Sequence, residues 1–232
     1  MTRPNPARDE ILGRIRTALN STPTEPGLPW QMGLDPPPGR TLDSTIAAGN
    51  LMGAFRNRLQ VAGGTFHLAW SPVEATDVIR EIALDTGARR VLHSDHPLVK
   101  LRTECMGDEF EWVSYDDDRE ELLSCDLGLT TANWGVAETG TIVLVSAAEH
   151  HRLASLLPPV HVALLDSACL VPTLDDLFAE VHDGDPDSLS RTITMITGPS
   201  RTADIELELA VGVHGPREVH VILLEHLEVN LP

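Results

Sequence analysis

The sequence predicts an α/β domain with an open, mixed but largely parallel sheet flanked by helices. The order of the expected elements supports this class, and the composition and length are compatible with it. Short apolar runs alternate with helical patterns from about residue 41 to residue 131, which implies parallel strands joined by right-handed crossovers. Hydrophobic residues make up 42% and charged residues 22% of the chain, an ordinary balance for a globular protein. The length of 232 residues fits one large α/β domain with a small arm.

The first 40 residues differ from the rest. Residues 7–19 place apolar side chains at helical spacing and charged ones on the opposite face, which predicts a short amphipathic arm. Residues 20–40 are rich in proline, including Pro36-Pro37-Pro38, and therefore predict an extended linker. We divide the chain into this arm and linker, residues 1–40, and an α/β domain, residues 41–232. The arm can dock on its own domain or on a partner.

The first half of the domain shows a regular order of elements. Ser71-Pro72 is a helix start with proline at its preferred first position, and Gly87 is a helix end. Asp43 or Ser44 can cap the first helix. The expected helices are residues 44–61, 73–86, 98–101 and 117–123, and the expected strands are residues 65–70, 90–93, 110–113 and 126–131.

After residue 131 the strands follow one another more closely, which suggests that the sheet becomes mixed. The expected strands are residues 141–146, 160–165, 168–171, 192–197 and 219–225, with a helix over residues 174–182. The last strand alternates between polar and apolar residues, which favours a position near an edge of the sheet.

Net charge and cysteine content exclude several classes of function. The formal net charge of -18 shows no basic footprint for nucleic acid and disfavours an anionic membrane surface. The three cysteines form no CxxC pair, so we expect neither a zinc site nor an iron–sulfur cluster on this chain alone, and we assign no metal. With no secretory signal and no apolar run long enough to span a bilayer, we expect a cytoplasmic protein.

The loop Asn133–Thr141 is the first candidate site. It lies between two apolar runs, and open α/β sheets bind ligands at the carboxyl ends of strands. Glu138, beside Thr139, Gly140 and Thr141, can act as a general base, as a nucleophile toward an acyl group, or as an acceptor for a ligand hydroxyl. It can equally cap the backbone of its own turn.

The second candidate follows the strand over residues 192–197. Gly198 and Pro199 turn the chain, and Ser200, Arg201 and Thr202 precede what reads as a helical turn containing Asp204. Free N–H groups at such a turn, together with Arg201, suit a carboxylate or phosphate. A capping box explains the hydroxyl and carboxylate residues equally well but leaves Arg201 unexplained.

His214, between two glycines, is the third candidate, as an acid, a base or a ligand. A histidine in such a turn is more often structural. The histidine pairs His93/His96 and His150/His151 lack an evident third ligand, so they too predict no metal site.

Taken together, these segments resemble a known family. Four blocks, residues 137–144, 155–161, 198–206 and 212–216, occur in this order in the lactate-utilisation (LUD) domain family, and the chain is most similar to its lactate-utilisation protein C type. The resemblance covers roughly residues 45 to 228. It implies a fold like the NagB/RpiA/CoA transferase superfamily and a role in oxidising L-lactate to pyruvate beside two iron–sulfur partner proteins.

The resemblance places the family's motif at Glu138, Thr139, Gly140, Thr141, Gly198, Ser200, Arg201, Thr202, Asp204 and His214. We expect Glu138, His214 and Asp204 to be catalytic. We expect the others, with Asn133, to bind a small carboxylate or acyl ligand. Electron acceptance must come from elsewhere, because this chain has no cluster cysteines and no GxGxxG sequence. The resemblance implies iron–sulfur clusters in the partner proteins. Two other readings stay open: an independent acyl or CoA transferase that uses Glu138, and a ligand-binding sensor or scaffold.

Overall fold

The computed structural model describes residues 10–14, 17, 44–146, 150, 152–182, 192–203, 209–211 and 215–225. The chain divides into two units, Met1–Thr41 and Leu42–Pro232. In the first unit, residues 10–14 and 17 are helical, in the segment where an amphipathic arm is expected, whereas the proline-rich linker lies outside the described residues.

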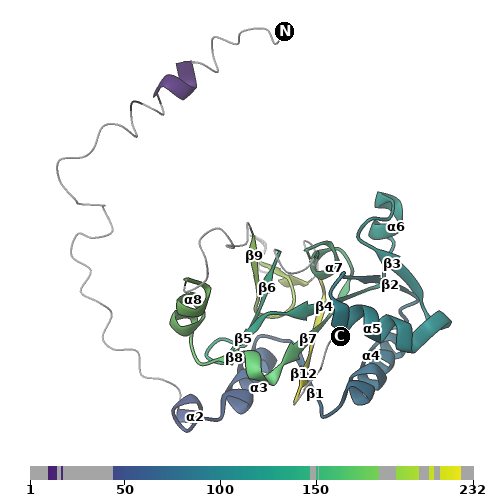
Figure 1. Ribbon diagram of the computed structural model, residues 1–232, viewed down its shortest axis with the longest axis horizontal. Helices are drawn as coiled ribbons and strands as arrows, with labels where there is room; N and C mark the ends of the chain where they lie inside the picture. The colour runs from purple at the N-terminus through teal and green to yellow at the C-terminus, as the bar shows by residue number, and fades with distance from the viewer. Residues whose placement is uncertain are drawn as a thin grey trace. The chain divides into compact units, whose positions relative to one another are not determined.

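The core of the second unit is a six-stranded sheet in which every pair of neighbouring strands is parallel, as the alternating pattern predicts (Figure 1). From edge to edge its strands are β1 (Thr65–Ala69), β12 (Glu218–Leu224), β7 (Val160–Asp166), β4 (Leu127–Ala132), β2 (Arg90–His93) and β3 (Glu111–Ser114). The last strand, expected near an edge, is second from it and pairs on both sides. Its alternation is confined to its first residues, where Glu218 is exposed and Val219 is buried.

The expected single mixed sheet is instead two sheets. The later strands β8 (Leu170–Val171), β5 (Trp134–Val136), β6 (Thr141–Val145) and β9 (Ile193–Ile196) form a separate four-stranded sheet, in this order, with antiparallel pairs on both sides of β6. The chain changes sheets at Asn133. This residue follows β4 directly, but its N–H donates to Val143 O (2.8 Å) and its Oδ1 accepts from Val145 N (2.7 Å), both on β6.

The segment after Gly198 also differs from the expected helical turn. It forms a two-stranded hairpin of β10 (Arg201–Ala203) and β11 (Leu209–Val211). The physical reason is the antiparallel partner. Pairing with residues six to ten positions later occupies the backbone groups that a helix would use internally.

Helices and the small sheet cover both faces of the parallel sheet. One face carries α4 (Pro72–Thr86) and α5 (Pro97–Met106), and the other carries α3 (Leu51–Val61), the small sheet, α6 (Arg119–Leu123) and α7 (Arg152–Leu156). Alternate residues of one strand therefore enter different cores. On β7, Val162 packs in the core under α4, and Ala163 packs in the core under α3. Burial on both faces explains the nearly continuous apolar sequence of these strands.

The outer face of the small sheet is covered by α8 (Leu174–His182), through a cluster of Val136, Val143, Val171 and Leu177 (Figure 1). The remaining elements are α2 (Ser44–Ala47) and the 3₁₀ turns η2 (Gly107–Glu109) and η3 (Ser167–Cys169). The helix expected over residues 44–61 is broken into α2 and α3. The break lies at Asn50, whose side chain accepts from Gly53 N (2.8 Å) and caps α3.

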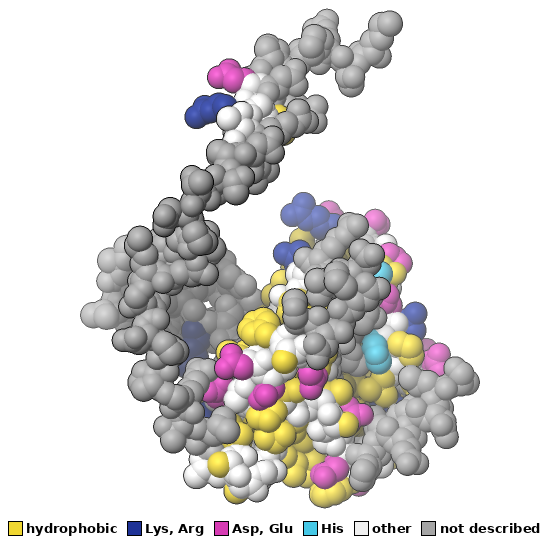
Figure 2. Space-filling view, turned by 60° about the vertical axis from the view of Figure 1, so that its left-hand side comes forward, with side chains coloured by type: hydrophobic (Ala, Val, Ile, Leu, Met, Phe, Trp, Pro, Cys, Tyr) yellow, Lys and Arg dark blue, Asp and Glu magenta, His cyan; other side chains and the backbone are white. Residues whose placement is uncertain are grey.

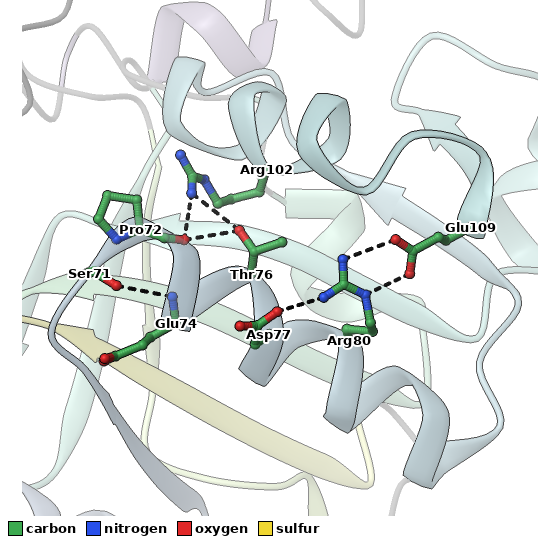
Figure 3. A network of polar contacts seen from close by, with 8 residues as sticks. All are labelled: Ser71, Pro72, Glu74, Thr76, Asp77, Arg80, Arg102 and Glu109. Carbon is green, nitrogen blue, oxygen red and sulfur yellow. Dashed lines mark hydrogen bonds and ion pairs between the residues drawn. The ribbon is translucent and has the colours of Figure 1, made fainter.

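Polar contacts join α4 to the elements that follow β2 (Figure 3). The buried Arg102 of α5 donates from Nη1 to Pro72 O (2.6 Å) and to Thr76 Oγ1 (3.2 Å) in the first turn of α4. Further along, Arg80 donates to both carboxylate oxygens of Glu109 (2.6 and 3.0 Å). These bonds hold α5 and the 3₁₀ turn η2 against α4. The caps of α4 are those that the sequence predicts, Ser71 at the start and Gly87, with φ of 69°, at the end.

Acidic side chains lie scattered over the face drawn in Figure 2 and do not gather into one patch. This distribution fits a solvated acidic surface. No helix among the described residues has the length and apolar character needed to cross a membrane.

Candidate functional site at the end of helix α3

The structure brings three of the four sequence blocks together around the last turn of α3. We call this group the α3-end cluster: Arg58–Gly63, Glu138–Thr141, Thr197–Arg201 and Gly215–Pro216. Its segments approach so closely that glycine is required at the contacts. A Cβ on Gly140 would lie 2.6 Å from the carbonyl carbon of Arg58, and one on Gly198 would lie 2.7 Å from Ala62 O.

The cluster lies at the amino-terminal edge of the parallel sheet. Gly63 and Gly64 lead from α3 into β1, and Pro216 and Arg217 lead into β12. The Glu138 loop does follow the carboxyl end of a strand, but that strand is β5 of the small sheet. The crevice expected at the carboxyl ends of the main sheet is therefore not where these residues meet.

The Glu138 loop is held by its backbone. Ala137 N donates to Val171 O (2.9 Å), Glu138 N donates to Pro172 O (3.0 Å), and Gly140 N donates to Val136 O (2.9 Å). Gly140 has φ of 68°, in the left-handed region that favours glycine. The carboxylate of Glu138 is thus presented from a rigid turn, half-buried at the cluster.

Three threonine hydroxyls connect this loop to the second block. Thr141 Oγ1 lies 2.6 Å from Thr139 Oγ1 and 2.7 Å from Thr197 Oγ1, and Thr141 is only 4% exposed. The chain of hydroxyls runs from the turn before β6 to the end of β9. It fixes the two blocks relative to each other and so positions both Glu138 and Arg201.

The second block lies against the start of β1 and β12. Ser200 N donates to Pro216 O (2.9 Å), and Gly215 packs on the Ser200 side chain. The guanidinium of Arg201 is exposed and occupies the space that a Cβ on Gly63 would take. Arg201 is therefore a cation that solvent or a ligand can reach, at the same helix end as the Glu138 loop.

The other predicted site residues fall elsewhere. Asn133 lies at the opposite end of β5 from Glu138, and its side-chain oxygen is bonded to the backbone of β6. Thr202 belongs to β10, where it pairs with Ala210, and its side chain is outside the described part of the structure. Asp204 and His214 lie outside the described residues altogether.

Sequence reasoning missed a polar cavity at the same edge of the sheet. This cavity, of about 810 Å³, contains His67 of β1 and His220 of β12. His67 Nε2 lies 3.1 Å from His220 Nδ1, and His220 Nε2 lies 3.4 Å from Glu218 Oε2. Burial and the neighbouring His220 lower the pKa of His67 to about 4. Burial also lowers the pKa of His220, against the opposing effect of Glu218. No local pattern could reveal a pair separated by 153 residues.

A second missed pair lies where β2 and β3 end. His150 donates its backbone N–H to Asp95 Oδ1 (2.6 Å), and its Nδ1 lies 2.6 Å from Asp95 Oδ2. The ring of Tyr115 stacks on His150 with centroids 4.3 Å apart. Burial alone would raise the pKa of Asp95, but its hydrogen bonds and charge interaction with His150 lower it overall. This pair is partly exposed and ties the segment before α7 to the end of β2.

Within the described residues, no three His, Cys, Asp or Glu side chains converge as metal ligands would. Burial raises the pKa of the Cys125 thiol to about 11 and also raises that of Cys169. Both thiols are therefore less acidic than an ordinary cysteine.

Comparison with known proteins identifies the family. The model of the LUD domain matches residues 52–224, and the chain belongs to this family. A "Lactate utilization protein C" of Halalkalibacterium halodurans is 39% identical over 118 residues, 49% of this chain and 51% of that protein. The protein of the same name from Exiguobacterium is 31% identical over 156 residues, 65% of this chain and 68% of that protein. The first of these matches spans about half of the relative's length.

A solved structure supports the fold. A protein of the DUF162 family from Deinococcus radiodurans superposes with a TM-score of 0.55 over 76% of this chain and 97% of that one. At 21% identity this similarity concerns the fold alone.

Proposed function

We propose that this chain is a subunit of an L-lactate-utilising system that oxidises lactate to pyruvate together with iron–sulfur partner proteins. Relatives named lactate utilization protein C, up to 39% identical, support the role in lactate utilisation. The observation that carries the assignment of a ligand site is the α3-end cluster. Three sequence blocks that are far apart in the chain meet there, on the last turn of α3. Each block could form its own turn without the other two, so their meeting point is the observation that suggests a shared ligand site.

In this proposal the cluster binds a small carboxylate or acyl ligand. Arg201 supplies an accessible guanidinium, and its planar group suits a carboxylate with two parallel hydrogen bonds. Glu138 is presented from a loop that Gly140 and the threonine hydroxyls hold in place, so its position is preorganised. Either Glu138 or His214 then takes a proton from the ligand.

Oxidation of lactate releases two electrons, and a carboxylate or an imidazole cannot accept them. In this proposal the electrons therefore leave to another protein. Iron–sulfur clusters in the partners would provide that acceptor.

Purification of this chain by affinity from its own cells grown on lactate tests the proposal. We expect an eluate with the visible absorption of iron–sulfur clusters and lactate-dependent dye reduction, and a colourless, inactive chain when it is purified alone. A colourless and solitary chain from both preparations would contradict the proposal and favour an acyltransferase or a sensor.

Variants then test the ligand site. Arg201→Gln and Glu138→Gln should lower lactate-dependent dye reduction while the complex still forms. Arg119→Gln, which removes an exposed cation from α6, is the matched control and should keep full activity. If both cluster variants keep full activity in a complex that oxidises lactate, the ligand site is wrong although the proposed function of the complex stands.

A further inference from the structure

The strand β1 forms one edge of the parallel sheet (Figure 1). Among the described residues, β12 is its only strand partner. The backbone N–H and C=O groups of Thr65–Ala69 that point away from β12 make no hydrogen bond within the described part of the chain. A row of unpaired backbone groups of this kind is a template on which a further strand can pair.

The sequence of β1 lacks the features that usually protect an edge strand, which are lysine, proline, an inward charge or a bulge. It reads Thr-Phe-His-Leu-Ala and pairs with β12 over five consecutive residues. The other edge strand, β3, carries a charge at Glu111, which forms an ion pair with Arg90 (2.9 Å). Of the two edges of the sheet, β1 is therefore the one open to pairing.

Large apolar side chains are exposed at both ends of this edge. Val61, in the helix that leads into β1, is 80% exposed, and Trp70, directly after the strand, is 63% exposed. Exposed apolar side chains that gather at one place mark interaction surfaces more often than those scattered singly. Here they extend the open edge of β1 in both directions.

Each face of the sheet has a recess beside β1. On the face covered by α3, Phe66 and Leu68 line an open recess of about 340 Å³. On the face covered by α4, Thr65 and His67 line the polar cavity of about 810 Å³. Successive residues of a strand point to opposite faces, so a strand added to β1 presents alternate side chains to the two recesses.

The two recesses differ in charge. Four carboxylates line the polar cavity against the single cation of Arg217, and they belong to Glu81, Asp85, Asp126 and Glu218. The two histidines of the cavity add no positive charge at neutral pH, because burial lowers the pKa of both. This face therefore suits basic side chains.

The recess under α3 suits apolar side chains. Met52 of α3 lines it together with Phe66 and Leu68 of β1. Arg56 lies over the ring of Phe66, 5.8 Å from its centroid, and so disfavours a second cation on this face. A second copy of this chain is a poor occupant of the edge, because its β1 contains no basic residue and its net charge is also -18.

We propose that the open edge of β1 binds an extended segment of a partner protein in which basic and apolar residues alternate. The segment adds a strand to the six-stranded sheet through backbone hydrogen bonds. Its basic residues face the carboxylates beneath α4, and its apolar residues enter the recess beneath α3. This surface does not depend on the ligand site of the α3-end cluster or on the oxidation of lactate.

Nuclear magnetic resonance of the ¹⁵N-labelled full chain tests the surface with synthetic peptides. The probe is Lys-Val-Lys-Leu-Lys-Val-Lys with blocked ends. We expect it to shift the amide resonances of Thr65–Ala69 and to slow hydrogen exchange of the amides in β1 that point away from β12. Two controls should do neither: Glu-Val-Glu-Leu-Glu-Val-Glu, which reverses the charge, and Lys-Lys-Lys-Lys-Val-Leu-Val, which keeps the composition but removes the alternation.

The same titration with variants tests the role of the carboxylates. Glu81→Gln combined with Asp85→Asn, both exposed on α4, should weaken binding of the alternating basic peptide by about 2- to 10-fold. Glu104→Gln, which alters an exposed carboxylate on α5, is the matched control and should bind as the unmodified chain does.

Three results would overturn the proposal. The first is an unchanged β1 at saturating concentrations of the alternating basic peptide. The second is an equal response to either control peptide, since binding would then need no alternation or no positive charge. The third is a dimer of this chain that protects the β1 amides without any peptide, because the edge would then belong to a second copy.

Discussion

The contact between the Glu138 loop and α3 makes a quantitative prediction for Gly140→Ala. Gly140 has φ of 68°, and an added Cβ would lie 2.6 Å from the carbonyl carbon of Arg58 and 2.8 Å from Leu59 Cα. The left-handed conformation costs a residue with a Cβ roughly 1–2 kcal/mol. Forcing an extra carbon into a packed contact costs roughly a further 1–3 kcal/mol. We therefore expect the free energy of unfolding to fall by about 2–5 kcal/mol, a large part of the ~5–15 kcal/mol typical of a domain.

Gly87→Ala is the matched control. Gly87 has nearly the same φ, 69°, but nothing lies within 4 Å of its added Cβ. It should lose only the conformational part, about 1–2 kcal/mol. Urea denaturation of both variants measures the difference, because a change in midpoint at constant slope reports stability. Equal losses in the two variants would refute the conclusion that the loop is pressed against the helix backbone.

Two further predictions concern polar groups. Thr141→Val removes the middle hydroxyl of the three that connect Thr139 to Thr197, and we expect it to lower the free energy of unfolding by about 1–3 kcal/mol. Thr141→Ser keeps the hydroxyl and should keep most of the stability. Urea denaturation measures both variants, and a Val variant as stable as the Ser variant would disprove the role of the hydroxyl. The pKa of His67 is about 4 in the folded state, below its ordinary value of 6.5. Between pH 6.5 and pH 4 the unfolded state therefore binds more protons than the folded state, and the free energy of unfolding decreases as the pH falls. His67→Gln should flatten the stability curve between pH 6.5 and pH 4, measured by thermal unfolding at several pH values, and an unchanged slope would show that His67 is not buried as a neutral base.

Local sequence signals were sufficient to predict most of the helices and strands. Ser71-Pro72 and Gly87 mark the ends of α4, and the apolar runs of β4 and β7 mark strands buried on both faces. These signals depend on a residue and its near neighbours, so they can be recognised in the sequence alone. The same reasoning failed at Arg201–Ala203, where a hydroxyl-rich segment pairs with β11 and so forms a strand where a helical turn was expected.

The arrangement of these elements needed contacts over long distances in sequence. Nothing near Asn133 indicates that the chain leaves one sheet for another, because the partner that draws it away is β6. The motif blocks at residues 138–141 and 198–201 could be recognised one by one, but their meeting point on the last turn of α3 could not, since Gly140 and Gly198 read only as turn residues.

The sequence by itself determined the α/β class, the parallel order of the first strands, the family and the candidate segments, because each of these depends on periodicity, on caps or on short motifs. Only the tertiary structure decided that the candidate residues lie at the amino-terminal edge of the sheet and that His67 lies beside His220. These features arise from strand pairing between residues more than 150 positions apart, Thr65 with His220 among them. Such pairing is selected by the packing of the whole core, and no local stretch of the chain contains that information.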